Sequence, residues 1–305
     1  MINIKYFIQN PRFIVVGLLK YFGQFLSDKQ YTKLLYWVSM GKSLNLESPQ
    51  TYNEKLNWLK LYDHNPLYTT LVDKYAVKEW VAAQIGEEYI IPTLGVWNKV
   101  EDIEWDLLPN QFVLKTTHGG GGDGVYVCKD KTQVNRKAVE TMFKRALNTN
   151  PYKRSREWPY KNVVPRIIAE KYMEDTETQE LRDYKFFAFA GEVKAMFIAS
   201  ERQKKGEEVK FDYYDVDFNH LDLRQNHPMS GKIINKPARF ELMKELASTL
   251  SRDLIEVRCD FYEVNGKVYF GEMTFFHHGA VTPFHPESWD YEWGSWIKLP
   301  VDNAL

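Results

Sequence analysis

The stretch at residues 112–124, FVLKTTHGGGGDG, constrains the fold most. An apolar run carrying Lys115 ends in four consecutive glycines, and a second apolar run at 125–128 follows at once. Alternation on both sides predicts two strands joined by a glycine-rich loop. Glycine permits a close approach, and successive backbone N–H groups can bind phosphate oxygens, to which Lys115 would add a positive charge. The alternative is an ordinary surface loop.

Other nucleotide-binding loops do not fit this stretch. Gly119, Gly121 and Gly124 match G-x-G-x-x-G, but the dinucleotide-binding turn requires a helix after the glycines, and here a strand is expected. Protein kinases place their lysine on the strand after the loop, whereas Lys115 precedes it. What remains is a flexible lid over a nucleotide.

Charge and cysteine content exclude some classes of protein. Forty basic and 41 acidic side chains give a net charge of −1, which does not favour a nucleic-acid partner. Cys128 and Cys259 fall inside expected strands and lack C-x-x-C spacing. We therefore expect a reducing, cytoplasmic setting.

The apolar segment at residues 13–22 is too short to span a bilayer and contains Lys20. We expect a buried or amphipathic helix there. The alternative is weak, peripheral association with the inner membrane face, aided by Arg12, Lys20, Lys29 and Lys33.

Periodicity and turn residues predict an α+β protein with mostly antiparallel sheets. The expected helices cover residues 31–40, 51–62, 73–86, 135–148 and 238–250, and the expected strands cover 90–97, 112–116, 125–128, 163–169, 184–190, 193–199, 211–218 and a final hairpin at 254–275. Thr51 and Glu54 form a capping box. Lys74 falls in the expected first turn of its helix, where a cation is unfavourable unless an anion lies near. The basic, aromatic segment at 151–166 is expected to be irregular and to lie over a nucleotide or an anionic sugar.

The final hairpin contains a cluster of charged residues. A two-residue turn at Asn265-Gly266 would place Asp260 and Glu272 on opposite faces. An odd loop count or a bulge would place them on one face, with Arg258 opposite Glu272 and Asp260 on the diagonal if the turn has three residues. Magnesium favours such carboxylates together with phosphates. We predict the one-face arrangement; the alternative is two solvated acids beside a salt-bridged arginine.

Five motifs in order resemble the ATP-grasp superfamily, and more closely its TupA-like branch, named for teichuronopeptide synthesis and found in polysaccharide gene clusters. They are Asp73-Lys74, the glycine stretch, Glu170–Met173, Arg258-x-Asp260 and Glu272-x-Thr274. The resemblance covers about residues 44–276. It implies an α+β ATP-grasp fold that holds the nucleotide between two subdomains containing antiparallel sheets. The implied divisions are a helical N-terminal extension at 1–50, an N-terminal subdomain at 51–100, a glycine-loop lid at 101–173 and a metal-binding subdomain at 174–305.

The resemblance also implies roles for single residues. Lys74 and Lys115 would hold the phosphates of ATP, Asp183 would contact the ribose, and Arg258, with Lys115, would act in catalysis. The glycine loop and the hinge would contact the nucleotide through His118, Gly119, Gly120, Gly121, Gly122, Glu170, Lys171, Tyr172 and Met173. Asp260 and Glu272 would bind Mg²⁺. Thr274 stands where the family usually has an asparagine for a second ion.

The function implied is an ATP-dependent carboxylate–amine ligase that acts through an acyl phosphate, with partners ATP, a carboxylate-bearing sugar or glycan precursor and an amine such as an amino acid. The alternatives are a glycosyltransferase, for which Asp215-Val216-Asp217 has metal-site spacing, and a nucleotide-binding module without catalysis. A C-terminal cluster of rings favours a sugar carboxylate, most simply a uronic acid, over a long apolar chain. It comprises His277, His278, His285, Trp289, Trp293 and Trp296.

Overall fold

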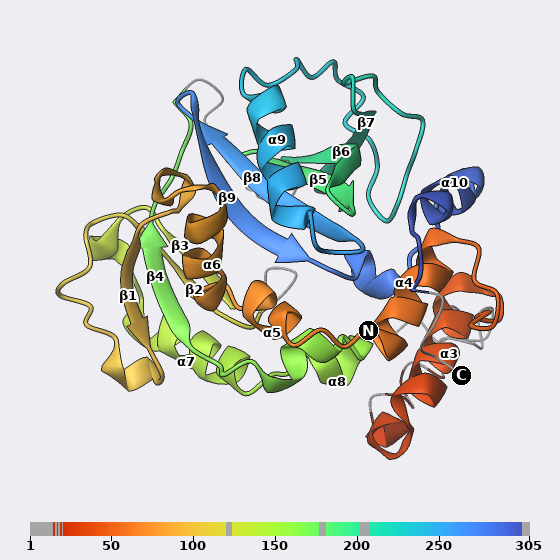
Figure 1. The fold of residues 1–305 in the computed structure, drawn as a ribbon. Helices are drawn as coiled ribbons and strands as arrows, with labels where there is room; N and C mark the ends of the chain where they lie inside the picture. Colours follow the sequence, from red (N-terminus) through yellow and green to blue (C-terminus); the bar gives the residue numbers. More distant parts are fainter. Residues whose placement is uncertain are drawn as a thin grey trace.

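Two antiparallel sheets organise the computed structural model, which describes residues 15, 17, 19, 21–119, 124–176, 181–201 and 208–300. The first sheet has the strand order β1-β4-β2-β3, and the second has the order β7-β6-β5-β8-β9. The two sheets lie on either side of helices α5 (Leu67–Val72) and α6 (Ala76–Ile85), as Figure 1 shows. The prediction of an α+β fold with antiparallel sheets is confirmed.

Strands β1 (Thr93–Trp97), β2 (Phe112–Thr116), β3 (Val125–Cys128) and β4 (Ile167–Lys171) form the first sheet. Phe112, Leu114 and Ala169 lie on its buried face, where they pack with Phe143 of helix α7 (Arg136–Leu147) in one apolar cluster. The opposite face carries Lys115. The strand, glycine loop and strand order is as predicted, because β2 and β3 pair antiparallel.

Strands β5 (Asp183–Phe189), β6 (Glu192–Ser200), β7 (Lys210–Asp215), β8 (Val257–Val264) and β9 (Lys267–Thr274) form the second sheet. One face packs against helix α9 (Phe240–Ser251), where the rings of Phe186 and Phe240 lie 5.7 Å apart. The other face carries the charged residues of the predicted metal hairpin.

Helix α3 (Asp28–Met40) and helix α4 (Tyr52–Tyr62) begin at capping boxes, on Ser27 and on the predicted Thr51. Helix α10 (Ser288–Trp296) packs against α4. Gly294 allows this, because a Cβ there would lie 2.2 Å from the carbonyl oxygen of Gln50. The remaining short elements are α8 (Pro151–Ser155), η1 (Gly23–Phe25), η2 (Glu87–Tyr89), η3 (Val100–Asp102), η4 (Lys131–Gln133), η5 (Trp158–Asn162) and η6 (His277–Ala280).

The structure differs from the prediction at several elements. Helices α5 and α10 were not predicted, and the segment expected to be irregular at 151–166 contains α8 and η5. Lys74 lies in the turn before α6 and not in its first turn, because Asp73 accepts hydrogen bonds from the backbone of Tyr75 and Ala76 and the helix starts only at Ala76. The predicted boundaries at residues 50, 100 and 173 stay a prediction.

Half of the apolar segment at 13–22 lies outside the described residues; residues 15, 17, 19, 21 and 22, which are described, are helical, as predicted. Within the described part of the chain, no helix has both the length and the apolar character needed to cross a membrane.

Candidate functional site

Three neighbouring strands of the second sheet align Lys185, Asp260 and Glu272 in one row. Lys185 on β5 pairs with Asp260 on β8, and Asp260 pairs with Glu272 on β9. Because side chains alternate along a strand, Asp183 and Arg258 lie on this same face. One face of the sheet therefore concentrates five charged side chains, most of them buried.

A β-bulge produces this alignment. Asn265 and Gly266 form a two-residue turn with φ of 50° and 74°, and Val264 pairs with Lys267. The register then shifts between Asp260 and Phe261, so that Gly271 is the extra residue and Asp260 lies directly opposite Glu272. The prediction of a bulge that places both carboxylates on one face is confirmed. The three-residue turn is wrong: Arg258 pairs with Thr274, and the two acids are opposite rather than diagonal.

Each carboxylate of this face contacts a cation. Arg258 donates to both oxygens of Asp260, at 2.7 and 2.8 Å, and Lys185 bridges Asp260 and Asp183, the latter at 2.8 Å. Lys74 lies 2.9 Å from Glu272. Burial alone would raise the pKa of Glu272, but Lys74, Lys185 and Arg258 hold this pKa well below its ordinary value.

Arg258 is fixed from three sides. Besides Asp260, its Nη2 donates to the hydroxyl of Thr274 at 3.0 Å, and its Nη1 lies 2.8 Å from Nδ1 of His277. A guanidinium has only donors, so His277 accepts through Nδ1 and is neutral. Burial, with His278 and Arg258 nearby, lowers the pKa of His277 well below its ordinary value and agrees with that assignment.

The turn that carries His277 has an unusual backbone, which α4 supports. His278, Gly279 and Ala280 all have positive φ, at 51°, 66° and 62°. Asn57 donates to the carbonyl of Ala280 at 2.7 Å, and Lys60 donates to that of Gly279 at 2.9 Å. Both side chains are buried, and burial lowers the pKa of Lys60 to about 8. Polar groups on one helix thus hold a left-handed turn in place.

Lys74 connects the hairpin to the glycine loop. Its Nζ lies 2.9 Å from both the carbonyl of Gly119 and Glu272, and its backbone N–H donates to the carbonyl of Thr117 at 2.9 Å. The structure therefore brings Lys74, Gly119 and Glu272 together. Gly120, Gly121 and Gly122 lie outside the described residues.

Lys115 lies on the face of the first sheet opposite to Leu114, where it shares Glu170 with Lys78 of α6. The carboxylate of Glu170 lies 2.7 Å from Lys115 and 2.5 Å from Lys78. Burial would raise the pKa of Glu170, but the two lysines lower it below its ordinary value. Glu170 is therefore an ionised partner of the predicted phosphate lysine.

The predicted hinge lies where the chain leaves the first sheet for the second. Glu170 and Lys171 end β4, and Tyr172 and Met173 follow as half-buried residues outside any helix or strand. Asp183, the predicted ribose contact, begins β5 and contacts Lys185. His118 points to the end of α7, because its Nε2 lies 3.0 Å from the carbonyl of Thr149.

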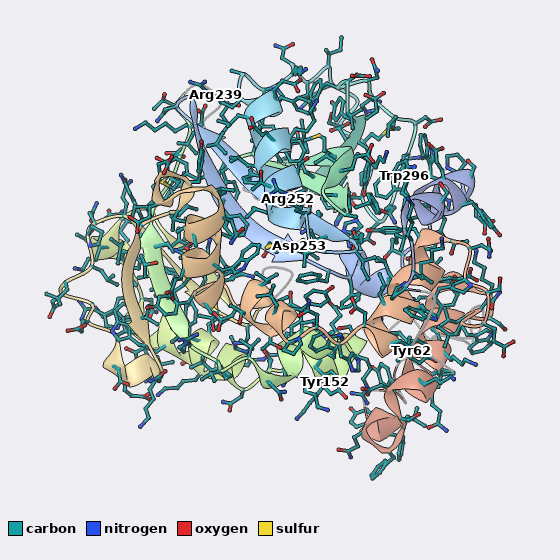
Figure 2. The ribbon with its side chains drawn as sticks, viewed as in Figure 1. Tyr62, Tyr152, Arg239, Arg252, Asp253 and Trp296 are labelled. Carbon is teal, nitrogen blue, oxygen red and sulfur yellow. The ribbon has the colours of Figure 1, made fainter. Side chains whose placement is uncertain are left out.

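The ring cluster expected to contact a sugar is largely part of the core. Trp293 is fully buried and packs on Phe187, with ring centroids 4.7 Å apart. Trp296 lies at the α10 end of the molecule, well apart from the sheet that carries Lys115 (Figure 2). The oxygens of Asp215 accept hydrogen bonds from Asp217 and Asn219 within a turn, which gives this D-x-D spacing a local structural role.

Sequence reasoning missed Lys185, Lys78 and the contact from His277 to Arg258. Lys185 has a usable signal, since Asp183-x-Lys185 in a predicted strand places both charges on one face. Lys78 and His277 have none, because each meets its partner only through the packing of separate elements.

The donor set fits a magnesium ion that is shared with a polyphosphate. Asp260 and Glu272 lie opposite each other, and magnesium takes one or two carboxylates plus phosphate oxygens. Among the described residues no three His, Cys, Asp or Glu side chains form a metal-binding group. Phosphate would supply the remaining oxygens, while Lys74 and Lys185 would be free to turn to it.

Comparisons with known proteins agree with this geometry. The model of the family described as TupA-like ATPgrasp matches residues 54–298. No curated protein matches the chain in sequence.

Several solved structures are similar to part of this chain. A D-alanine–D-alanine ligase from Bacillus anthracis complexed with ATP is 15% identical, with a TM-score of 0.39 over 68% of this chain and 54% of that one. The same enzyme from Helicobacter pylori is 16% identical, with a TM-score of 0.41 over 81% and 69%. An L-amino acid ligase from Bacillus licheniformis is 11% identical, with a TM-score of 0.44 over 84% and 55%. This chain thus spans about half the length of the first and third enzymes.

The family match covers most of the chain, and the fold is the α+β ATP-grasp fold that the motifs implied. The chain belongs to the TupA-like ATP-grasp family.

Proposed function

We propose that the protein is an ATP-dependent carboxylate–amine ligase that joins an amine, such as an amino acid, to a uronic acid of a surface polysaccharide precursor. The observation that carries the proposal is the row of Lys185, Asp260 and Glu272 beside Arg258 on one sheet face. Phosphoryl transfer needs charge neutralisation and positioning more than a protein nucleophile, and this face offers both.

In this proposal the two sheets divide the work. Lys115 on the first sheet, and Lys74 between the sheets, bind the phosphates, with Gly119–Gly122 closing over them. Glu170–Met173 contact the adenine, and Asp183 contacts the ribose. Asp260 and Glu272 would hold Mg²⁺, which would offset the negative charge of the phosphates, and Thr274 would complete a second site.

Arg258 has the catalytic role that its surroundings support. Its guanidinium is held by Asp260, Thr274 and His277. One planar cation therefore lies in a fixed orientation beside the two carboxylates proposed to bind magnesium. A carboxylate that attacks the terminal phosphate gathers negative charge there, and a fixed cation stabilises it. Because His277 is neutral, it orients Arg258 without neutralising or repelling the charge of the guanidinium.

The test is an assay with ATP, Mg²⁺, methyl glucuronide and mixed amino acids, read by mass spectrometry. An amide of the uronic acid formed with equimolar ADP would support the proposal. Release of a nucleoside diphosphate from a sugar donor would indicate a glycosyltransferase instead. ATP binding without any turnover would indicate a nucleotide-binding module. Arg258→Lys is the variant to compare, since it keeps the charge and loses the planar, three-sided contact.

A further inference from the structure

A buried carboxylate lies one position beyond Arg258 on the same sheet face. The alternation that brings Asp260 and Arg258 to this face continues to Glu256, directly before β8. Tyr52 of α4 confirms the side: its ring packs 6.5 Å from that of Phe187, which pairs with Arg258, and its hydroxyl donates to Glu256. Along this face of the hairpin, Asp260 and Glu272 therefore come first, followed by Arg258 and then by Glu256.

Among the described residues, only one oxygen of this carboxylate has a hydrogen-bond donor. The hydroxyl of Tyr52 donates to Oε1 of Glu256 at 2.8 Å, whereas Oε2 has no hydrogen-bond partner within the described part of the chain, although the side chain is only 3% exposed. Burial raises the pKa of Glu256 to about 8, against the lowering effects of the Tyr52 hydrogen bond and of the charge on Arg258. When Glu256 is ionised, its Oε2 is therefore a buried acceptor that lacks a donor.

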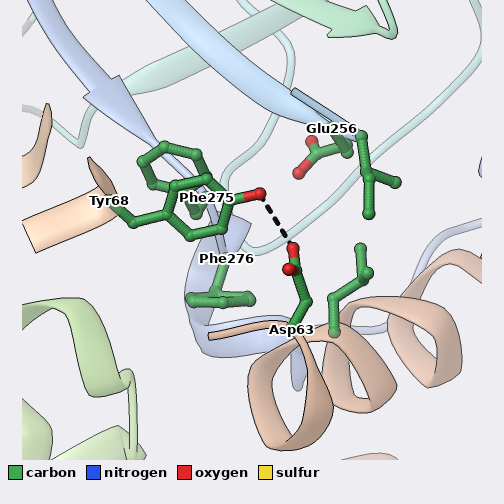
Figure 3. Close-up of a pocket in the computed structure, with 7 residues that line it drawn as sticks. Asp63, Tyr68, Glu256, Phe275 and Phe276 are labelled. Carbon is green, nitrogen blue, oxygen red and sulfur yellow. Dashed lines mark hydrogen bonds between the residues drawn. The ribbon is translucent and has the colours of Figure 1, made fainter. Parts of the chain in front are cut away.

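Glu256 lines a small cavity that is partly open to solvent, together with Asp63, Tyr68, Phe275 and Phe276 (Figure 3). The hydroxyl of Tyr68 donates to Asp63 at 2.8 Å, so this second carboxylate keeps its place at the wall. Tyr68 stacks on Phe275 with ring centroids 4.1 Å apart. The enclosed part has room for a group about the size of one water molecule.

The small enclosed space of the cavity, with its lining of carboxylates and aromatic rings, favours one kind of chemical group. An ammonium has the size of a water molecule, donates hydrogen bonds, pairs with carboxylates and is attracted to aromatic faces. A sugar ring or a carboxylate is too large or carries the wrong charge. We propose that this cavity is the subsite for the amine substrate of the ligase, and that Oε2 of Glu256 takes the proton that the ammonium loses; this rests on the proposed function.

The step balances as follows. The ammonium gives one proton to Glu256, and the nitrogen lone pair attacks the acyl carbon of the acyl phosphate to form a C–N bond. The bond from the acyl carbon to the bridging oxygen then breaks, and phosphate leaves with that electron pair. The nitrogen loses a second proton to the departing phosphate, and Glu256 returns its proton to solvent. Glu256 lies beyond Arg258 and away from Asp260 and Glu272. If phosphate leaves toward Arg258, the amine would stand on the side where Glu256 lies.

The experiment measures binding of ¹³C-methylammonium to the whole chain by NMR line broadening at pH 9, where Glu256 is ionised and methylammonium keeps its charge, without ATP or a carboxylate. We expect saturable binding to the wild type that Glu256→Gln weakens at least fivefold. Asp63→Asn should weaken it less and serves as a second variant if Glu256→Gln folds poorly. Glu292→Gln, the same change at an exposed site on α10, should have no effect.

Size gives a further control, since tetramethylammonium is too large for the enclosed space and should not compete. No binding to the wild type, or equal binding to wild type and Glu256→Gln, would overturn the inference. A protein that binds methylammonium through Glu256 but releases no ADP would contradict the ligase proposal. A ligase that ignores methylammonium would contradict the amine subsite alone.

Discussion

Lys115 and Lys78 share one buried carboxylate, Glu170, and this arrangement bears on the proposed phosphate role of Lys115. Two lysines on one carboxylate leave one positive charge in excess. An incoming phosphate can therefore attract Lys115 while Glu170 keeps Lys78. The proposed binding of phosphate by Lys115 needs this surplus positive charge.

Lys115→Met should weaken ATP binding at least tenfold, about 1.4 kcal/mol, because it removes that surplus charge. Glu170 keeps Lys78, so the melting temperature should change little. Calorimetric titration with ATP and Mg²⁺ measures the loss. Lys144→Met, which removes a half-exposed lysine of α7 paired with Glu101, is the control. Equal affinities of wild type and Lys115→Met would rule out the phosphate role.

Glu256 should also affect the dependence of stability on pH. Its pKa is about 8 in the folded state and near 4.5 when unfolded. The folded state therefore keeps a proton that the unfolded state loses. This contribution is fully present below pH 4.5 and declines as the pH rises toward 8, by up to about 1.4 kcal/mol per pH unit.

Urea unfolding at pH 5, 6.5 and 8 tests this. Wild type should lose more free energy of unfolding across the range than Glu256→Gln, which cannot titrate. Tyr52 and Tyr68 stay neutral because burial raises the pKa of both, and Arg258 stays charged. Parallel curves for the two proteins would show that Glu256 does not hold the proton.

The bulge in the β8–β9 hairpin, which sets the position of Asp260 relative to Glu272, depends on one glycine. A Cβ at Gly271 would lie 3.1 Å from the carbonyl oxygen of Asp260 and 3.1 Å from the ring of Tyr262. Gly271→Ala should therefore disturb the bulge, cost about 1–3 kcal/mol and move Asp260 relative to Glu272. We expect weaker Mg²⁺-dependent ATP binding, whereas Lys267→Ala at the exposed end of β9 should leave it unchanged. A variant with wild-type stability and affinity would show that the bulge does not set the site.

Helix α4 supports the left-handed turn through buried polar groups, and one of these can be removed cleanly. Asn57→Ala takes away the donor to Ala280 and leaves that carbonyl unpaired, which should cost about 1–3 kcal/mol in chemical unfolding. Asn148→Ala, which removes an exposed side chain at the end of α7, should cost less than about 0.5 kcal/mol. Similar losses for both would mean that the turn needs no support from α4.

The elements that the sequence predicts best are those with local signals. The Thr51 capping box, the apolar stripe of α7 and the Asn265-Gly266 turn are each encoded within a few residues. Helix α5 is short and has no side-chain cap, and the aromatic residues of α10 pack on α4 and β5, so neither had a readable local pattern.

Across the whole molecule, the site depends on contacts between segments far apart in the chain. Lys74 joins Gly119 to Glu272, and Arg258 meets His277 beyond the end of β9. The motifs predicted Lys74, Asp260 and Glu272 as site residues, and the structure brings them together, whereas their roles toward ATP and magnesium stay predictions. The motifs could not predict that Lys185 completes the row, or that Trp293 belongs to the core, because packing decides both.

The central claim is that a substrate carboxylate is activated by phosphate from ATP, and transfer of oxygen tests it most directly. Methyl glucuronide labelled with ¹⁸O in its carboxylate is incubated with the protein, ATP, Mg²⁺ and mixed amino acids, and the phosphate is examined by ³¹P NMR. Attack by the carboxylate and displacement by the amine must leave one carboxylate oxygen on phosphate, so we predict one ¹⁸O per phosphate released. Phosphate without ¹⁸O, or no ATP-dependent release of phosphate at all, would contradict the account.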